Sequence, residues 1–101
     1  MSQAHTLVPL LAALVVGSTA MAADPQAGAE LYQRHCTQCH GAIGRPLLPN
    51  APDLSRPMAL LKPDLNLLAV IRGGRGAMPA YQGQLRDREI LDIVAHLRTW
   101  R

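Results

Sequence analysis

The clearest hydrophobic pattern lies near the C-terminal end of the chain. Apolar residues there recur every three or four positions, as one face of an amphipathic helix requires, at Ile90, Ile93, Val94, Leu97 and Trp100. Asp87 stands just before the pattern begins. We therefore predict a terminal helix that starts near Asp87 and buries this stripe.

A second helical pattern follows Asp24 and Pro25, a pair typical of a helix N-cap and the first helical position. Residues spaced as one helical face then follow at Gly28, Leu31, Tyr32 and His35. A glycine inside a helix costs about 1 kcal/mol relative to alanine. Gly28 therefore favours the close approach of another helix, with a tolerated surface glycine as the alternative. This first helix leads directly into Cys36.

The middle of the chain is divided by glycine and proline. Residues 41–63 contain too many of these breakers for a long helix or a regular strand, although a short helical turn over 58–61 fits. We expect Asp64 to cap a further helix that Gly73 and Gly74 end. In the loop before it, we expect three side chains to face inward: Leu47, Leu48 and Leu54.

The N-terminal residues form a separate segment. Residues 7–16 are apolar and are followed by Ala20-Met21-Ala22, a pattern typical of a secretory signal peptide with its cleavage site. We predict a signal peptide over 1–22 and one domain over 23–101, without a stable membrane span, because a span needs roughly 20 apolar residues. Residues 1–6 contain no Lys or Arg, so an uncleaved anchor remains the alternative. Either way, we expect the domain to be exported to the periplasm.

Composition changes the picture in two ways. The chain has no Phe and only three aromatic residues of the Phe, Tyr and Trp type, so a domain of this size needs another source of buried apolar surface. The formal net charge is +3, but the basic residues are dispersed. Binding to nucleic acid needs clustered positive charge, so nucleic acid is not the expected partner.

The candidate chemistry is carried by Cys36, Cys39 and His40, which form a Cys-x-x-Cys-His motif. This spacing is typical of the attachment of a c-type haem: the thiols bond to the vinyl groups, and the adjacent imidazole is an axial ligand of iron. The competing interpretations of Cys-x-x-Cys are a redox disulfide, half of a zinc site and a structural bridge. These are the only two cysteines, so a zinc site lacks its second ligand pair. One covalent haem c is the prediction.

A haem iron held by one histidine needs a sixth ligand, or else it stays open. Methionine is the ligand that raises the reduction potential in cytochromes c. We predict Met78, which sits in a compact loop before Pro79, with Met58 as the alternative. The remaining histidines are expected to be partly exposed surface residues rather than ligands: His5, His35 and His96.

A proximal histidine usually donates its second ring N–H to an acceptor, which fixes the orientation of the ring. We expect that acceptor to be a backbone carbonyl in the proline-rich loop. Pro52 is the first choice, and Pro46 is the second.

With these residues in place, residues 28–100 resemble the class I monohaem cytochromes c. The family's motifs occur in order: Gly-x-x-Leu-Tyr from Gly28, Cys-x-x-Cys-His-Gly from Cys36, Pro-x-Leu from Pro52, Met-Pro at Met78, and a terminal helix. The resemblance implies an all-α cytochrome c fold, with the N- and C-terminal helices crossing at close range and the haem enclosed by loops. It also implies His40 and Met78 as axial ligands and the Pro52 carbonyl as the acceptor from His40.

The chain departs from the family pattern at two positions of the terminal helix. His96 stands where an aromatic residue often occurs, and Arg86 replaces the usual Ser or Thr cap, which leaves Asp87 as the candidate cap. The loop around Met78 is similar to that of the small c55x-type cytochromes associated with haem cd1 nitrite reductase.

We expect an electron carrier rather than an enzyme: a monomer that meets redox protein partners. The candidate partners are cytochrome cd1 nitrite reductase and, as the alternative, a membrane quinol-oxidising complex. Three alternatives remain open, namely a haem-delivery or assembly factor, an open-site haem sensor or peroxidase, and a haemless dithiol oxidoreductase using Cys36 and Cys39.

Overall fold

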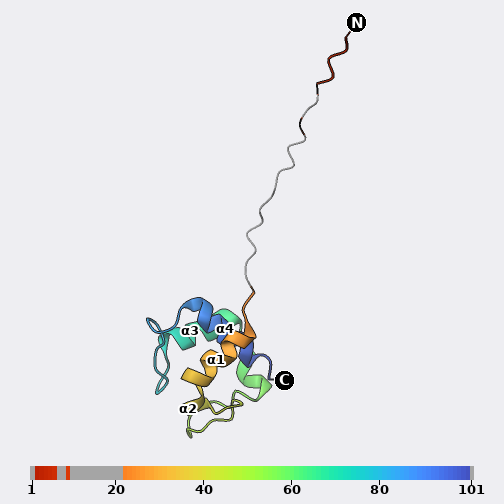
Figure 1. Cartoon of the computed structure of the whole chain (residues 1–101). Helices are drawn as coiled ribbons and strands as arrows, with labels where there is room; N and C mark the ends of the chain where they lie inside the picture. Colours follow the sequence, from red (N-terminus) through yellow and green to blue (C-terminus); the bar gives the residue numbers. More distant parts are fainter. Residues whose placement is uncertain (1, 7–8, 10–21, 101) are drawn as a thin grey trace.

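A computed structural model describes residues 2–6, 9 and 22–100 (Figure 1). The elements follow in the order α1 (Pro25–His35), α2 (Thr37–His40), the 3-10 helix η1 (Pro57–Leu60), α3 (Asp64–Gly73) and α4 (Asp87–Leu97). Residues 22–100 contain isolated β-bridges but no β-strand. The prediction of an all-α fold is confirmed.

Helix α1 begins as its sequence predicts. The Asp24 side chain accepts a hydrogen bond from the backbone N–H of Gln26 at 2.9 Å, and Pro25 occupies the first helical position. The backbone N–H of Asp24 in turn donates to the Asp92 carboxylate at 2.8 Å. The start of α1 is therefore fixed to α4, 68 positions later in the chain.

The crossing of α1 and α4 depends on Gly28. A Cβ added at Gly28 would lie 2.8 Å from the backbone nitrogen of Ile93, and closer still to the backbone carbonyl of Asp92. Backbone atoms cannot rotate away, so no larger residue fits without separating the helices. The predicted close helix contact is confirmed, and Gly28 is the residue that permits it.

The core forms around the apolar stripe of α4. Ile90, Ile93 and Val94 are almost fully buried, and Tyr32 from α1 is 2% exposed. The rest of the core comes from η1, α3, the segment before α4 and the end of α4: Leu60, Leu68, Ile71, Leu85 and Leu97. The terminal helix is confirmed, except that it ends at Leu97, so Trp100 packs against the core from beyond the helix.

Two predicted helix caps are wrong by one residue. Pro63 occupies the cap position of α3 and Asp64 is its first helical residue, while Arg86 occupies the cap position of α4 ahead of Asp87. In α4, the Glu89 carboxylate accepts a hydrogen bond from the Arg86 backbone N–H at 3.0 Å, the return bond of a capping box. The predicted end of α3 is confirmed, because Gly74 follows Gly73 with a φ of 74°.

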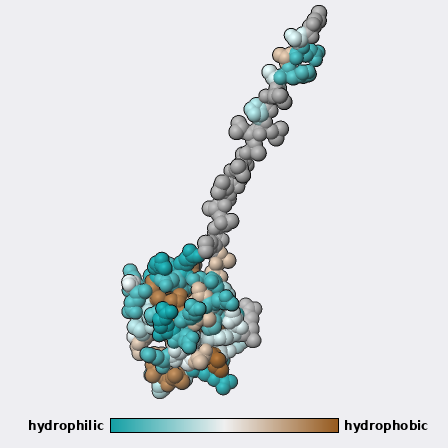
Figure 2. Space-filling view, viewed as in Figure 1, coloured by the Kyte–Doolittle hydropathy of each residue, from teal (hydrophilic) through white to brown (hydrophobic). Residues whose placement is uncertain are grey.

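Of the three leucines expected to face inward in the proline-rich loop, one packs against the protein core. Leu54 packs against the core, but Leu47 is 67% exposed and Leu48 is also exposed. The loop backbone is held by two bonds, from the Leu47 N–H to the Cys39 carbonyl and from the Leu54 N–H to the Gly44 carbonyl. Figure 2 shows hydrophobic side chains at the lower end of the domain, where Figure 1 places α2 and this loop.

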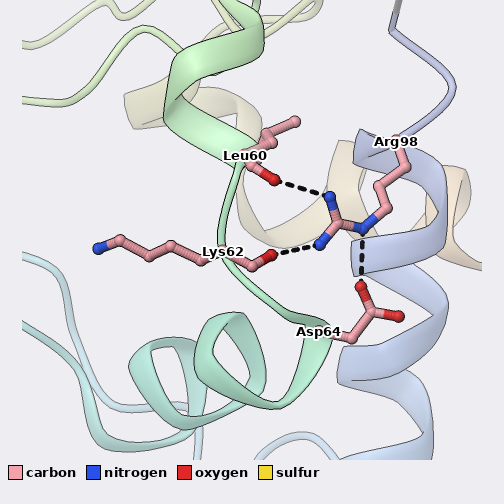
Figure 3. A network of polar contacts seen from close by, with 4 residues as sticks. All are labelled: Leu60, Lys62, Asp64 and Arg98. Carbon is pink, nitrogen blue, oxygen red and sulfur yellow. Dashed lines mark hydrogen bonds and ion pairs between the residues drawn. The ribbon is translucent and has the colours of Figure 1, made fainter.

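Arg98, just after α4, holds the connection between η1 and α3 (Figure 3). Its guanidinium donates to the carbonyl oxygens of Leu60 at 2.7 Å and Lys62 at 2.6 Å, and to the Asp64 carboxylate at 2.7 Å. The planar fork of arginine suits several acceptors at once. This network ties the C-terminal end of the domain to its middle.

The predicted signal peptide lies largely outside the described residues. Among the residues that the structure does describe, no helix has the length and apolar character needed to cross a bilayer.

Candidate functional site

The two cysteines of the motif lie at the junction of α1 and α2. Cys36 follows the last residue of α1, and its N–H donates to the Tyr32 carbonyl at 2.8 Å. Its own carbonyl then accepts from the N–H of His40 at 2.9 Å. Three positions separate the cysteines, so both side chains project from nearly the same side of one helical turn.

Both thiols are free and half-buried. Burial, and then the neighbouring Cys39, raise the pKa of Cys36 to about 11, so this thiol is neutral at physiological pH. The described residues hold no cluster of three or more His, Cys, Asp or Glu side chains of the kind that binds a metal ion. The pair therefore fits covalent attachment better than a zinc site, which needs four ligands.

Two tyrosine hydroxyls hold the ends of the attachment segment. Tyr32 of α1 donates to the carbonyl of Gly41 at 2.6 Å, directly after His40. Tyr81 donates to the carbonyl of His35 at 2.9 Å, directly before Cys36. These are the only two tyrosines of the chain, and no pattern in the sequence predicts a role for either hydroxyl. A hydrogen bond between residues 46 positions apart leaves no local pattern in the sequence.

His40 is the last residue of α2 and is half-buried. Burial lowers the pKa of its imidazole below the usual value, which favours the neutral ring that can ligate a metal. The Nδ1 atom is buried and has no hydrogen-bond partner.

The acceptor that the sequence predicts for this ring is not in place. Pro52 lies on the surface of the loop, between the backbone bonds that fix Leu47 and Leu54, and His40 forms no hydrogen bond with it or with Pro46. The bond from His40 to Pro52 stays a prediction for the haem-bound protein.

Met78 sits on a short, well-fixed loop after α3. Arg75 and Met78 exchange two backbone hydrogen bonds, of 3.0 and 2.9 Å, which close a tight turn. Gly74 packs beneath this turn, where a Cβ would lie 2.7 Å from the Met78 carbonyl oxygen. Met78 and Cys36 both pack, half-buried, against the core cluster. Met58, the alternative ligand, is 77% exposed on η1.

The other histidines of the folded domain have aromatic neighbours. The His35 ring meets Tyr81 edge-on, with ring centroids 6.0 Å apart. The His96 ring lies 5.4 Å from Tyr32 and 5.1 Å from Trp100, so it fills the aromatic position of the terminal helix. His35 and His96 are half-buried, in line with the prediction of partial exposure, while His5 lies in the exposed N-terminal residues.

The domain has the features that a covalently held porphyrin requires. Large apolar side chains are exposed on the loop after α2, on η1 and on α3, at Ile43, Leu47, Leu48, Met58, Leu61 and Leu65. Exposed apolar side chains in such number indicate a binding surface. Together with two free thiols and a buried, neutral imidazole, they fit a haem. Cys36 and Cys39 would form the thioethers, and His40 would ligate the iron.

An all-α domain that attaches haem through such a segment is a c-type haem protein, and comparison with known proteins agrees. The sequence model of the family described as "Cytochrome C oxidase, cbb3-type, subunit III" matches residues 23–97. A cytochrome c6 of Picosynechococcus sp. is 32% identical, over 93% of this chain and 88% of its own.

Solved structures lead to the same family. The cytochrome c6 of the diatom Phaeodactylum tricornutum superposes with a TM-score of 0.63 and 27% identity, over 75% of this chain and 92% of its own. A c-type cytochrome named KustC0563 has the same fold, with a TM-score of 0.67 at 23% identity, over 73% of this chain and 96% of its own.

The chain therefore belongs to the cytochrome c family, as a class I monohaem cytochrome c. It has one covalently bound haem c, and it is an electron-transfer carrier with redox partners rather than an enzyme.

Proposed function

We propose that this protein carries one electron at a time in the periplasm, with His40 and Met78 as the two axial ligands of its haem iron. The bound haem supplies the redox chemistry, because its iron gains and loses one electron reversibly between Fe(III) and Fe(II). The observation that carries the proposal is the fixed backbone of Met78, closed by its turn with Arg75 and packed over Gly74. A ligand on a rigid loop keeps its position in both oxidation states.

Two further observations support this ligand set. Burial keeps the His40 ring neutral by lowering its pKa, as a ligand through nitrogen requires. Met58, in contrast, lies on η1 and does not pack against the core cluster as Met78 does. A filled sixth position excludes substrates from the iron, which fits a carrier and not an open-site sensor or peroxidase.

The test compares Met78→Ala with Met58→Ala in the ferric haem-bound protein. The unmodified protein should show the weak far-red charge-transfer band of sulfur-ligated haem. We expect Met78→Ala to abolish the band and to lower the reduction potential, because thioether ligation raises it. Met58→Ala is the matched control and should leave both unchanged. Loss of the band in Met58→Ala alone would assign the ligand to Met58, and its absence from the unmodified protein would favour an open site.

Export and cleavage after Ala22 complete the proposal, with a membrane-anchored domain facing the periplasm as the alternative. The mass of the purified protein tests this, because the mature chain should begin at Ala23 and carry one haem. An unmodified mass with two free thiols would instead favour the dithiol oxidoreductase.

The partners we propose are redox proteins of a respiratory chain that dock through small, transient contacts. The resemblance of the Met78 loop to the c55x-type cytochromes makes cytochrome cd1 nitrite reductase the first partner to test. Stopped-flow mixing with the ferrous protein should reduce that enzyme and sustain its turnover. Reduction without turnover would favour an assembly factor, and no reduction would direct attention to a membrane quinol-oxidising complex.

A further inference from the structure

Tyr81 connects three parts of the domain. Its backbone N–H donates to the Ile71 carbonyl of α3 at 3.1 Å, and its own carbonyl accepts from the Leu85 N–H at 2.9 Å, just before α4. Its hydroxyl donates to the His35 carbonyl at the end of α1, also at 2.9 Å. The backbone of Tyr81 is therefore fixed, and its side chain reaches across to α1.

The hydroxyl bond joins the two segments that bear the proposed ligands. Met78 stands three residues before Tyr81, on the turn that follows α3. His35 directly precedes Cys36, the first residue of the attachment segment. The acceptor is one of the last carbonyls of α1, a group that the helix itself leaves without a partner. The edge-on contact between the rings of His35 and Tyr81 reinforces this junction.

We propose that Tyr81 is a positioning residue for Met78. By holding the turn of Met78 against the end of α1, the Tyr81 hydroxyl fixes the separation between the thioether and the haem that Cys36, Cys39 and His40 hold. This inference rests on the proposed ligation by His40 and Met78. One hydroxyl group then keeps the distance between the methionine sulfur and the iron constant.

Tyr32 provides the matched control. Its hydroxyl also donates to a backbone carbonyl next to the attachment segment, that of Gly41, but both groups lie within the α1–α2 region, nine positions apart. Tyr32 is also the more buried of the two tyrosines. Removing its hydroxyl should lower the overall stability at least as much, while leaving the turn of Met78 attached to α1.

The experiment titrates ferric haem-bound Tyr81→Phe and Tyr32→Phe with imidazole, which displaces a weakly held methionine, and follows the far-red sulfur band. Removing one hydrogen bond and leaving the His35 carbonyl unpaired should raise the imidazole affinity of Tyr81→Phe about tenfold. Tyr32→Phe should stay within about twofold of the unmodified protein. Phenylalanine keeps the ring of Tyr81, so the fold should be retained.

A second readout does not depend on added ligand. Amide hydrogen exchange of Met78, whose N–H donates to the Arg75 carbonyl, should accelerate in Tyr81→Phe relative to the core amide of Ile93. In Tyr32→Phe, any acceleration should affect both amides alike.

The outcomes separate this inference from the function on which it rests. If the unmodified protein lacks the far-red band, the proposed ligation by Met78 fails and the role of Tyr81 fails with it. If the band is present and Tyr81→Phe binds imidazole no better than the unmodified protein, only the role of Tyr81 is overturned. Equal gains in Tyr81→Phe and Tyr32→Phe would also overturn it, because the effect would then follow from lower overall stability.

Discussion

Replacing Gly28 by alanine should destabilise the domain, although alanine is the better helix former. The added Cβ would lie 2.8 Å from the Ile93 backbone nitrogen, where ordinary contact needs 3.4–4 Å, and the overlap with the Asp92 carbonyl is worse. The two helices must therefore move apart until both backbone contacts reach that range, which loosens the packing of Tyr32 against the core of α4.

The size of the effect follows from two opposing terms. Overpacking against a rigid neighbour costs about 3 kcal/mol, at the upper end of the usual range, because both neighbours are backbone. The helix preference of alanine returns about 1 kcal/mol. The net loss is about 2 kcal/mol, which lowers the melting temperature of a domain of this size by roughly 8–16 °C.

Gly73→Ala is the control for Gly28→Ala. Gly73 is also helical, at the end of α3, but a Cβ there meets nothing within 4 Å. Thermal unfolding followed by circular dichroism should show Gly73→Ala at least as stable as the unmodified protein and Gly28→Ala clearly less stable. A Gly28→Ala protein that melts with the unmodified one would refute the close crossing of α1 and α4.

Two further predictions concern the end of α4. Arg98→Ala should lower the free energy of unfolding in urea by about 2 kcal/mol, because the carbonyls of Leu60 and Lys62 and the Asp64 carboxylate lose a charged donor. Arg98→Lys should recover only part of this free energy, and full recovery would argue against the three-acceptor geometry. Burial lowers the pKa of His96 below its ordinary 6.5, so the unfolded chain binds the proton first and stability should fall as the pH drops below 6.5. His96→Phe should flatten that fall between pH 7 and 5, and unchanged curves would remove His96 as its cause.

The features predicted correctly from the sequence are those set by local pattern. Asp24 caps α1 because a short acidic side chain before proline reaches the free N–H groups of the first turn. The stripe of α4 follows from helical periodicity. Gly28 was interpreted correctly because a glycine in a helix needs a reason, and a crossing backbone supplies one.

The features that the sequence did not predict depend on partners far away in the chain. The bonds of Arg98 to the η1–α3 connection span at least 34 positions, and no spacing rule anticipates them. The bond between Tyr81 and His35 is of the same kind. Leu47 does not pack against the protein core, because hydrophobicity alone does not say whether a loop residue faces the protein or a bound group.

The pairing of α1 with α4 also bears on the order of events while the chain is synthesised. The backbone that fills the space above Gly28 comes from Asp92 and Ile93, near the far end of the chain. Any chain delivered from its N-terminus presents Cys36, Cys39 and His40 well before that backbone arrives. The thiols are thus accessible to an incoming porphyrin while the scaffold is still open, and the last helix closes the domain behind them.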